Sequence, residues 1–278
     1  MKRVSLLLIF FGLASIFFSL AVVASGWSEP RVWEQSGASV DRMPWYDPPT
    51  KTLYFIRDYN IYQSSFVNTA WTKPVEVEIP GLNTRQNQVN PVKRGNHLYF
   101  ASYFPATDYD FYMTTWNQET ETWGEAVRLT ELSGEDQDWA LWVNTAETEA
   151  YLISKGPFGD QQVRGGRGVW KAVKSDGEWQ RPRPLTGAIN SEGNEWSVFK
   201  DEQSGKIYID SNRPGSLGSY DIWVLAGEDQ TAVNLGRPIN TELSERSLWT
   251  DGKVLFFSAL DYENGIGGYD IFVSFYQD

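Results

Sequence analysis

The sequence predicts an all-β fold, a five-bladed β-propeller built from four-stranded antiparallel blades. One segment recurs about five times at a period of roughly 40–55 residues, which is typical of repeat architectures. It is clearest at Ser211–Val224 and Ser258–Val273, and looser copies end at Tyr62, Tyr112 and Trp170. The chain also has thirteen Trp, fourteen Tyr and 24 Gly residues, and almost no helical apolar periodicity follows its first 24 residues. Radial repetition of short β-rich units favours a propeller.

Residues 1–24 are a candidate export signal. Lys2 and Arg3 precede an apolar run from Val4 to Ala24, and cleavage before Ser25 would leave a mature chain. The run is also long enough to span a bilayer as an uncleaved anchor, so both alternatives stay open. Either way Lys2 and Arg3 stay on the cytoplasmic side, and the remaining chain becomes periplasmic or extracellular.

Composition limits the classes of function. The net charge is −12, and loss of the two cations of the leader makes it −14. Nucleic-acid binding needs a basic face, so we expect no nucleic-acid partner. The acidic balance fits solubility or a cationic partner. The chain has no Cys, which excludes disulfides, thiol chemistry and a lipoprotein anchor.

The outer strands are expected in Trp-containing segments that open the repeats. Two of these segments contain Pro74 and Pro182, and proline is tolerated mainly at sheet edges because it lacks an N–H donor. The candidate outer strands are 31–35, 70–75, 122–127 and 178–182.

The inner strands follow, and their register comes from matching Asn190–Val198 with Asn240–Leu248 at an offset of fifty residues. Tight turns such as Asp251-Gly252-Lys253 then lead to a second strand and a third. The expected second strands are 53–56, 97–102, 150–154, 206–210 and 254–258, and the clearest third strands are 220–225 and 269–275.

The strand count predicts how the ring closes. The last repeat ends after its third strand, and the segment Val32–Gln35 has no inner strands before it. If this N-terminal segment supplies the outer strand of the last blade, no sheet edge is left bare. We therefore expect one propeller domain over residues 28–278, acting as a monomer.

A Tyr-Asp-Ile element ends the recurring segment. Its aspartates are Asp110, Asp221 and Asp270, with Asn60 in the first repeat and Gly168 in the third. An acid that recurs in nearly every blade is expected to accept hydrogen bonds from neighbouring backbone amides.

These residues resemble the WD40-like β-propeller repeat of the TolB type. The pattern is clearest in Asn190-Ser191, Glu195, Ile207–Arg213 and Tyr220–Trp223, and it recurs through Asn240–Phe272. The resemblance is strong over residues 180–278 and moderate over 30–180. It implies an exported bacterial propeller that serves as a binding or scaffolding module in the cell envelope. A shared fold does not by itself name an activity.

Two sets of long loops are expected on one face of the ring, and a ligand face is expected where long loops converge on the central channel. Each blade places one polar residue there, and the next position adds Arg or Trp in four blades. The candidate ligand-binding residues are Arg42, Gln88, Asp138, Trp139, Glu195, Trp196, Glu245 and Arg246, with Asp41 completing the first set.

Three interpretations of this set stay open. Acidic residues at one position of every repeat are structural in many repeat proteins, bonding to loop amides. The alternative is a carbohydrate-active enzyme, because glycoside hydrolysis uses two carboxylates about 5–10 Å apart. Ca²⁺ binding through oxygen ligands is a further possibility, although no cofactor is required. The four candidate catalytic carboxylates are Asp41, Asp138, Glu195 and Glu245.

Two other features complete the sequence. His97 is the only histidine and lies beside a tight turn, which argues against a Ser-His-Asp triad or a His-rich metal site. The insertion Lys155–Arg167 is a candidate specificity loop. Together the sequence predicts a non-enzymatic module that binds a protein or glycan on the long-loop face.

Overall fold

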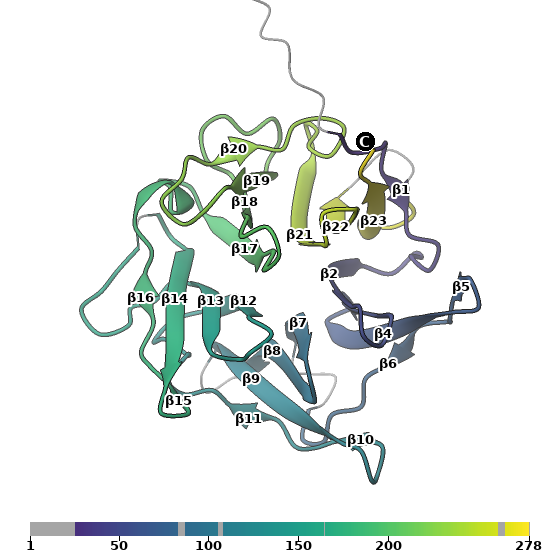
Figure 1. The fold of residues 1–278 in the computed structure, drawn as a ribbon, viewed down its shortest axis with the longest axis horizontal. Helices are drawn as coiled ribbons and strands as arrows, with labels where there is room; N and C mark the ends of the chain where they lie inside the picture. The colour runs from purple at the N-terminus through teal and green to yellow at the C-terminus, as the bar shows by residue number, and fades with distance from the viewer. Residues whose placement is uncertain (1–25, 83–86, 105–107, 164, 261–264, 278) are drawn as a thin grey trace, which may run out of the picture.

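The computed structural model describes residues 26–82, 87–104, 108–163, 165–260 and 265–277. Five antiparallel sheets stand around a central axis, which confirms the five-bladed β-propeller (Figure 1). Strands β2, β7, β12, β17 and β21 are innermost and contact one another around the ring. The 3₁₀ turn η1 (Gly187–Ile189) is the one helical element that the described ranges contain. The leader, residues 1–24, lies outside the described residues.

Each of the first three blades has three long strands and an outer edge divided into two short pieces. Blade 1 contains β2 (Asp41–Asp47), β3 (Thr52–Arg57), β4 (Asn60–Val67), β5 (Ala70–Trp71) and β6 (Val75–Glu76). Blade 2 contains β7 (Gln88–Arg94), β8 (His97–Phe104), β9 (Asp108–Asn117), β10 (Thr122–Trp123) and β11 (Val127–Arg128). Blade 3 contains β12 (Asp138–Val143), β13 (Glu149–Ser154), β14 (Gly168–Ser175), β15 (Glu178–Trp179) and β16 (Arg183–Pro184).

The last two blades each have a single short outer strand. Blade 4 contains β17 (Glu195–Lys200), β18 (Ile207–Ser211), β19 (Asp221–Leu225) and β20 (Val233–Asn234). Blade 5 contains β21 (Ser244–Thr250), β22 (Val254–Leu260), β23 (Tyr269–Phe275) and β1 (Arg31–Val32).

The split outer edge differs from the continuous outer strands that the sequence predicts. In blade 1 the break lies at residues 72–74, and in blade 3 at residues 180–182. Pro74 and Pro182 fall in these breaks, and a proline cannot donate the ladder hydrogen bond that a continuous strand needs.

The structure confirms that the N-terminal segment supplies the outer strand of the last blade, and we call this segment the N-terminal latch. Strand β1 pairs antiparallel with β23, with Arg31 opposite Val273 and Val32 opposite Phe272. The Trp33 amide then donates to the Ile271 carbonyl at 2.8 Å. Trp33 is only 2% exposed and packs edge-on against Phe55 of blade 1. The latch therefore closes blade 5 and also fills the junction between the last and first blades.

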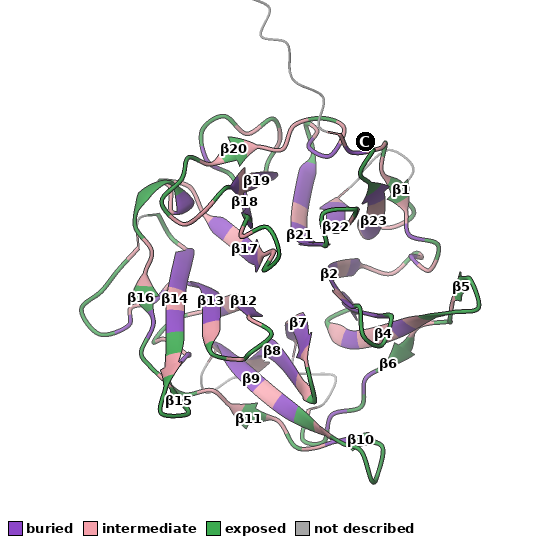
Figure 2. Ribbon diagram, viewed as in Figure 1, coloured by how far each residue is buried: buried purple, intermediate pink, exposed green. Residues whose placement is uncertain are grey.

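The core lies between the blades. The second strands β3, β8, β13, β18 and β22 are buried on both faces almost throughout, whereas the outer strands are mostly exposed (Figure 2). Both faces of a middle strand pack against neighbouring blades, so these strands read as continuous apolar runs rather than as alternating ones. This packing holds the inner strands, and with them the channel mouth, in fixed positions.

Every inner strand has a register shift near its start. In blades 1, 2 and 5 this shift contains a residue in the left-handed region: Met43 (φ 56°), Asn90 (φ 53°) and Ser247 (φ 52°). Blades 3 and 4 have a shorter shift after Asp138 and after Glu195. Such bulges re-aim the side chains beside them, and here they act on the predicted site residues.

Candidate functional site

The first set of predicted residues is buried inside the blades. Asp41, Asp138, Glu195 and Glu245 are each 0% exposed, and Gln88 is 6% exposed. Each of the four carboxylates accepts a backbone N–H from the residue four positions earlier. These bonds run from Gly37 to Asp41 (3.3 Å), Gly134 to Asp138 (2.8 Å), Ser191 to Glu195 (3.3 Å) and Thr241 to Glu245 (3.1 Å).

Arginine side chains bind two of these carboxylates as well. Asp41 is paired with Arg57 through both oxygens, each at 2.7 Å. Glu195 accepts bonds from Arg213 and Ser211, both at 3.0 Å. These carboxylates therefore fasten the incoming loop to its own blade.

Burial raises the pKa of the four carboxylates. Desolvation raises the pKa of Asp41, Asp138 and Glu195 against the opposing effect of their donors. Burial also raises the pKa of Glu245 to about 7, because Thr241 is a neutral partner and no cation offsets the desolvation. A raised pKa of this kind follows from burial alone and does not require a catalytic role.

The second set of predicted residues faces the channel mouth. Arg42, Trp196 and Arg246 line a cavity of about 20 Å³ together with Tyr269. The Arg246 guanidinium carbon lies 4.5 Å from the Trp196 ring centroid, and the rings of Trp139 and Trp196 are 4.7 Å apart. The structure thus brings Arg42, Trp139, Trp196 and Arg246 to one place, while the adjacent acidic residues turn into the blades.

The sequence interpretation missed five further residues of this mouth. They occupy the position just before the recurring Asp of the third strand, where four blades have tyrosine and blade 3 has arginine: Tyr59, Tyr109, Arg167, Tyr220 and Tyr269. The recurring Tyr-Asp pair is the signal that could have found three of them, and Tyr59 precedes Asn60 at the same position of the first repeat. Arg167 departs from the repeat, and only its alignment with those tyrosines could have drawn attention to it.

The two sets interlock into one group, which we call the mouth ring. It consists of Arg42, Trp139, Trp196 and Arg246 together with Tyr59, Tyr109, Arg167, Tyr220 and Tyr269. Within it, a residue of an inner strand contacts the third-strand residue of its own blade and that of the preceding blade. Trp196 contacts Tyr220 (5.8 Å) and Arg167 (4.3 Å), Arg246 contacts Tyr269 (5.9 Å) and Tyr220 (3.8 Å), and Trp139 contacts Arg167 (4.9 Å) and Tyr109 (4.8 Å).

The insertion Lys155–Arg167 reaches this ring at its C-terminal end. Phe158 anchors the loop, since it is buried and packs edge-on against Trp170 at 4.8 Å. The guanidinium of Arg167, at the end of the loop, then contacts the rings of both Trp139 and Trp196. The most individual segment of the chain therefore supplies a side chain to the channel mouth.

The predicted structural role of the recurring aspartates is confirmed in blades 4 and 5. Asp221 accepts backbone N–H bonds from Leu217 (2.6 Å) and Gly218 (3.0 Å). Asp270 accepts them from Ile266 (2.6 Å) and Gly267 (2.9 Å). In blade 2 a side chain takes over this role, because Asp110 is paired with Arg128 through two bonds of 2.8 Å.

The comparisons with known proteins support the fold and no more. No family model matches the chain, and no curated protein does. Among solved structures, a putative TolB from Agrobacterium tumefaciens is 13% identical, with a TM-score of 0.53 over 86% of this chain and 83% of its own. A thermostable family-43 glycoside hydrolase is 11% identical, with a TM-score of 0.56 over 87% and 90%. The calcium-binding protein regucalcin from Agrobacterium tumefaciens is 8% identical, with a TM-score of 0.55 over 89% and 95%.

At these identities the likeness shows a common fold, and it shows no common activity. The TolB-type resemblance in the sequence is therefore supported at the level of the propeller.

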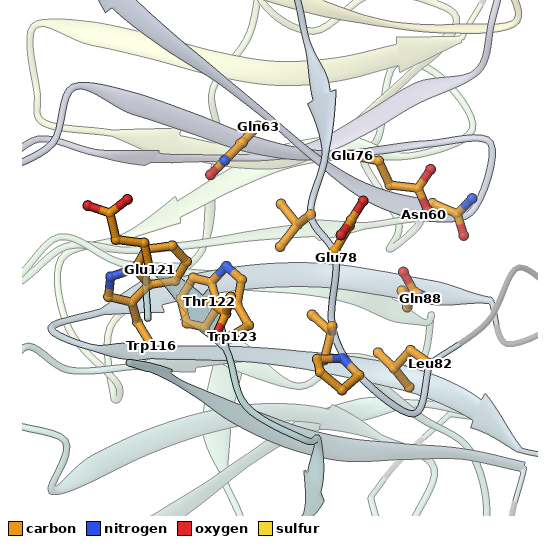
Figure 3. Close-up of a pocket in the computed structure, with 13 residues that line it drawn as sticks. Asn60, Gln63, Glu76, Glu78, Leu82, Gln88, Trp116, Glu121, Thr122 and Trp123 are labelled. Carbon is orange, nitrogen blue, oxygen red and sulfur yellow. The ribbon is translucent and has the colours of Figure 1, made fainter. Parts of the chain in front are cut away.

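Larger cavities lie outside the mouth ring. One of about 500 Å³ separates blades 1 and 2; Trp116 and Trp123 form one wall, and Glu76 and Asn60 lie on the opposite side of Glu78 (Figure 3). Another of about 760 Å³ lies beside the insertion, and a third of about 420 Å³ lies beside the latch. None of them includes a predicted site residue other than Gln88.

Within the described ranges, no three His, Asp or Glu side chains are placed to hold one metal ion together. The same ranges contain no helix with the length and apolar character needed to span a bilayer.

Proposed function

We propose that this five-bladed propeller is an exported binding module that meets a protein or glycan partner at the mouth ring and carries out no reaction on it. The observation that carries the proposal is the opposite orientation of adjacent residues in the inner strands. The carboxylates face their own loops, and the Arg and Trp side chains face the channel.

Burial of the carboxylates favours binding over hydrolysis. A catalytic acid must come within about 3 Å of the glycosidic oxygen, directly or through one water. Asp41, Asp138, Glu195 and Glu245 are all 0% exposed, and each already accepts bonds from its own blade. The mouth ring offers aromatic and guanidinium groups, which are the side chains that dominate binding hot spots.

The binding role can be tested on glycan and peptide arrays. We expect wild-type protein to bind a subset of spots, Trp196→Ala to lose them, and Lys206→Gln to keep them. Lys206 is an exposed cation at the turn before β18 and serves as the matched control. If Trp196→Ala still binds the same spots, the binding site lies outside the mouth ring.

The hydrolase alternative is tested in parallel with glycoside substrates. If the wild-type protein hydrolyses a substrate, and Glu245→Gln or Glu195→Gln abolishes that activity without altering thermal stability, the protein is an enzyme and the binding-module proposal is wrong. If both variants only melt earlier, their carboxylates are structural.

Export rests on the leader in the sequence. N-terminal sequencing of the chain recovered from the cell envelope of a bacterial host tests it. A start at Ser25 indicates cleavage, a start at Met1 indicates an anchor, and retention in the cytoplasm contradicts export.

A further inference from the structure

The mouth ring contains an unusual group of arginines. Arg42, Arg167 and Arg246 make no ion pair with an acidic residue in the described part of the chain. Other arginines of this acidic protein do, with nitrogen–oxygen separations of 2.7 Å in Arg57–Asp41, 2.8 Å in Arg128–Asp110 and 3.0 Å in Arg213–Glu195.

Stacking explains how the three cations are held. Arg167 lies over Trp139 and Trp196, Arg246 over Trp196 and Tyr220, and Arg42 over Tyr59 at 4.7 Å. Stacking uses the faces of a guanidinium and leaves its in-plane N–H donors free.

Several of those donors are buried without a partner. Nε and Nη1 of Arg167 and Nε of Arg42 are covered from solvent, and they make no hydrogen bond to the described residues. A buried donor without an acceptor costs free energy, and a charged donor costs more than a neutral one. Burial, reinforced by the Arg246 guanidinium, lowers the pKa of Arg167 from its ordinary value. An anion bound beside these guanidinium groups would offset their buried positive charge.

A buried carboxylate close enough to act on Arg167 and Arg246 serves another purpose. Asp210 is 1% exposed and accepts backbone bonds from Ser197 (2.6 Å) in blade 4 and Ser247 (2.7 Å) in blade 5. Burial raises the pKa of Asp210 and the Arg246 guanidinium opposes that rise, but the two side chains form no ion pair in the described part of the chain. Asp210 therefore joins two blades below the ring and leaves the guanidinium donors of the mouth available.

From these contacts we propose that Arg42 and Arg246, with Arg167 beside Arg246 on the Trp196 ring, receive a carboxylate group from a protein partner. This deepens the binding role proposed above and rests on it. A guanidinium fork complements a planar carboxylate through paired N–H bonds. The cavity of about 20 Å³ between Arg42 and Arg246 holds about one water-sized polar group, such as one carboxylate oxygen, and has no room for a sugar ring. Guanidinium groups already cover the Trp196 ring, so it offers no open platform to a glycan.

The test uses the full-length chain and three probes: a (Gly-Glu)₄ peptide, a (Gly-Gln)₄ peptide and trigalacturonate. We expect the Glu peptide to bind with an affinity that falls as salt rises, and the Gln peptide not to bind. Loss of one charge-assisted contact corresponds to about tenfold in affinity or more, so Arg246→Gln and Arg42→Gln should each weaken Glu-peptide binding by that factor. Arg246→Lys should restore only part of it, because it keeps the charge and loses the fork. Lys206→Gln should bind like wild type.

Other results would overturn the proposal. Equal binding of the Glu and Gln peptides, or equal weakening by Lys206→Gln, removes the carboxylate site. Binding of trigalacturonate without the Glu peptide replaces the protein partner with an acidic glycan. If no acidic probe binds while array ligands still depend on Trp196, the carboxylate inference fails and the binding module stands. Arg42→Gln keeps the test decisive if Arg246→Gln unfolds, since Arg42 stacks on a tyrosine that is 47% exposed.

Discussion

In four of the five inner strands, the residues at two neighbouring positions point in opposite directions. The first carries Asp41, Asp138, Glu195 and Glu245, which are fully buried and bonded within their blades. The second carries Arg42, Trp139, Trp196 and Arg246, which meet side chains from other blades at the channel mouth. Successive residues of a strand point to opposite sides, and a bulge beside this pair fixes the angle of each. The four acidic residues therefore belong to the structural framework of the blades, and the Arg and Trp residues next to them form the accessible surface.

The largest expected loss of stability comes from removing one of the buried carboxylates. Glu195→Ala leaves Arg213, only 7% exposed, without its carboxylate. Removing one partner of a buried ion pair costs about 3–5 kcal/mol, and chemical denaturation should show a loss of that size in the free energy of unfolding. Glu192→Ala, a change at an exposed neighbour, should stay within about 0.5 kcal/mol. Similar small losses in both variants would place Glu195 outside the framework.

The pH dependence of the free energy of unfolding provides a second test of the buried carboxylates. The pKa of Glu245 is about 7 in the folded protein against 4.5 in the unfolded chain, because burial disfavours the charged carboxylate. Between these values the folded state binds more protons, so the free energy of unfolding falls as pH rises, by at most about 3 kcal/mol from this residue.

Glu245→Gln should flatten that dependence. Denaturation of both proteins at pH 5 and pH 8 measures it, and the variant should lose less stability than wild type between the two. Parallel profiles would show that Glu245 ionises as freely in the folded state as in the unfolded one.

A smaller effect is expected from the aromatic half of the mouth ring. Trp196 contacts two guanidinium groups and two rings but is only partly buried. Each such contact contributes about 0.5–1 kcal/mol, so Trp196→Ala should lower the free energy of unfolding by about 2 kcal/mol. Trp196→Phe should retain roughly half of this, as thermal and chemical unfolding would report. A loss as large as that of Glu195→Ala would erase the distinction between the two positions.

The smallest effect is expected at Arg42. Its guanidinium stacks on the exposed ring of Tyr59, so Arg42→Gln should cost less than about 1 kcal/mol in the free energy of unfolding. Stability measured by denaturation should therefore stay near that of wild type while Glu-peptide binding drops. A loss above about 2 kcal/mol would make Arg42 part of the framework instead.

Much of the fold was predictable because each blade corresponds to one sequence repeat. The match of Asn190–Val198 with Asn240–Leu248 set the inner strands, and the missing outer strand of the last repeat indicated the latch. The division of the outer strands was not predicted. It depends on where a proline or a bend interrupts pairing with the third strand, which a repeat alignment does not show.

The site was predictable only in part. The alignment located both inner-strand positions but could not tell which of them faces the channel. It included Arg167 only as the last residue of the candidate specificity loop, because blade 3 departs from the repeat there and a long insertion obscures the alignment. The role of Arg167 depends on Trp139 and Trp196, which lie on different blades.

By itself the sequence determined the number of blades, their order and the closing strand, because each blade is encoded by a contiguous repeat with its own turns and apolar runs. Only the tertiary structure decided that the carboxylates turn inward and that three arginines gather among aromatic rings. Those contacts join side chains of different blades, and ring closure together with the bulges of the inner strands sets the distances between them.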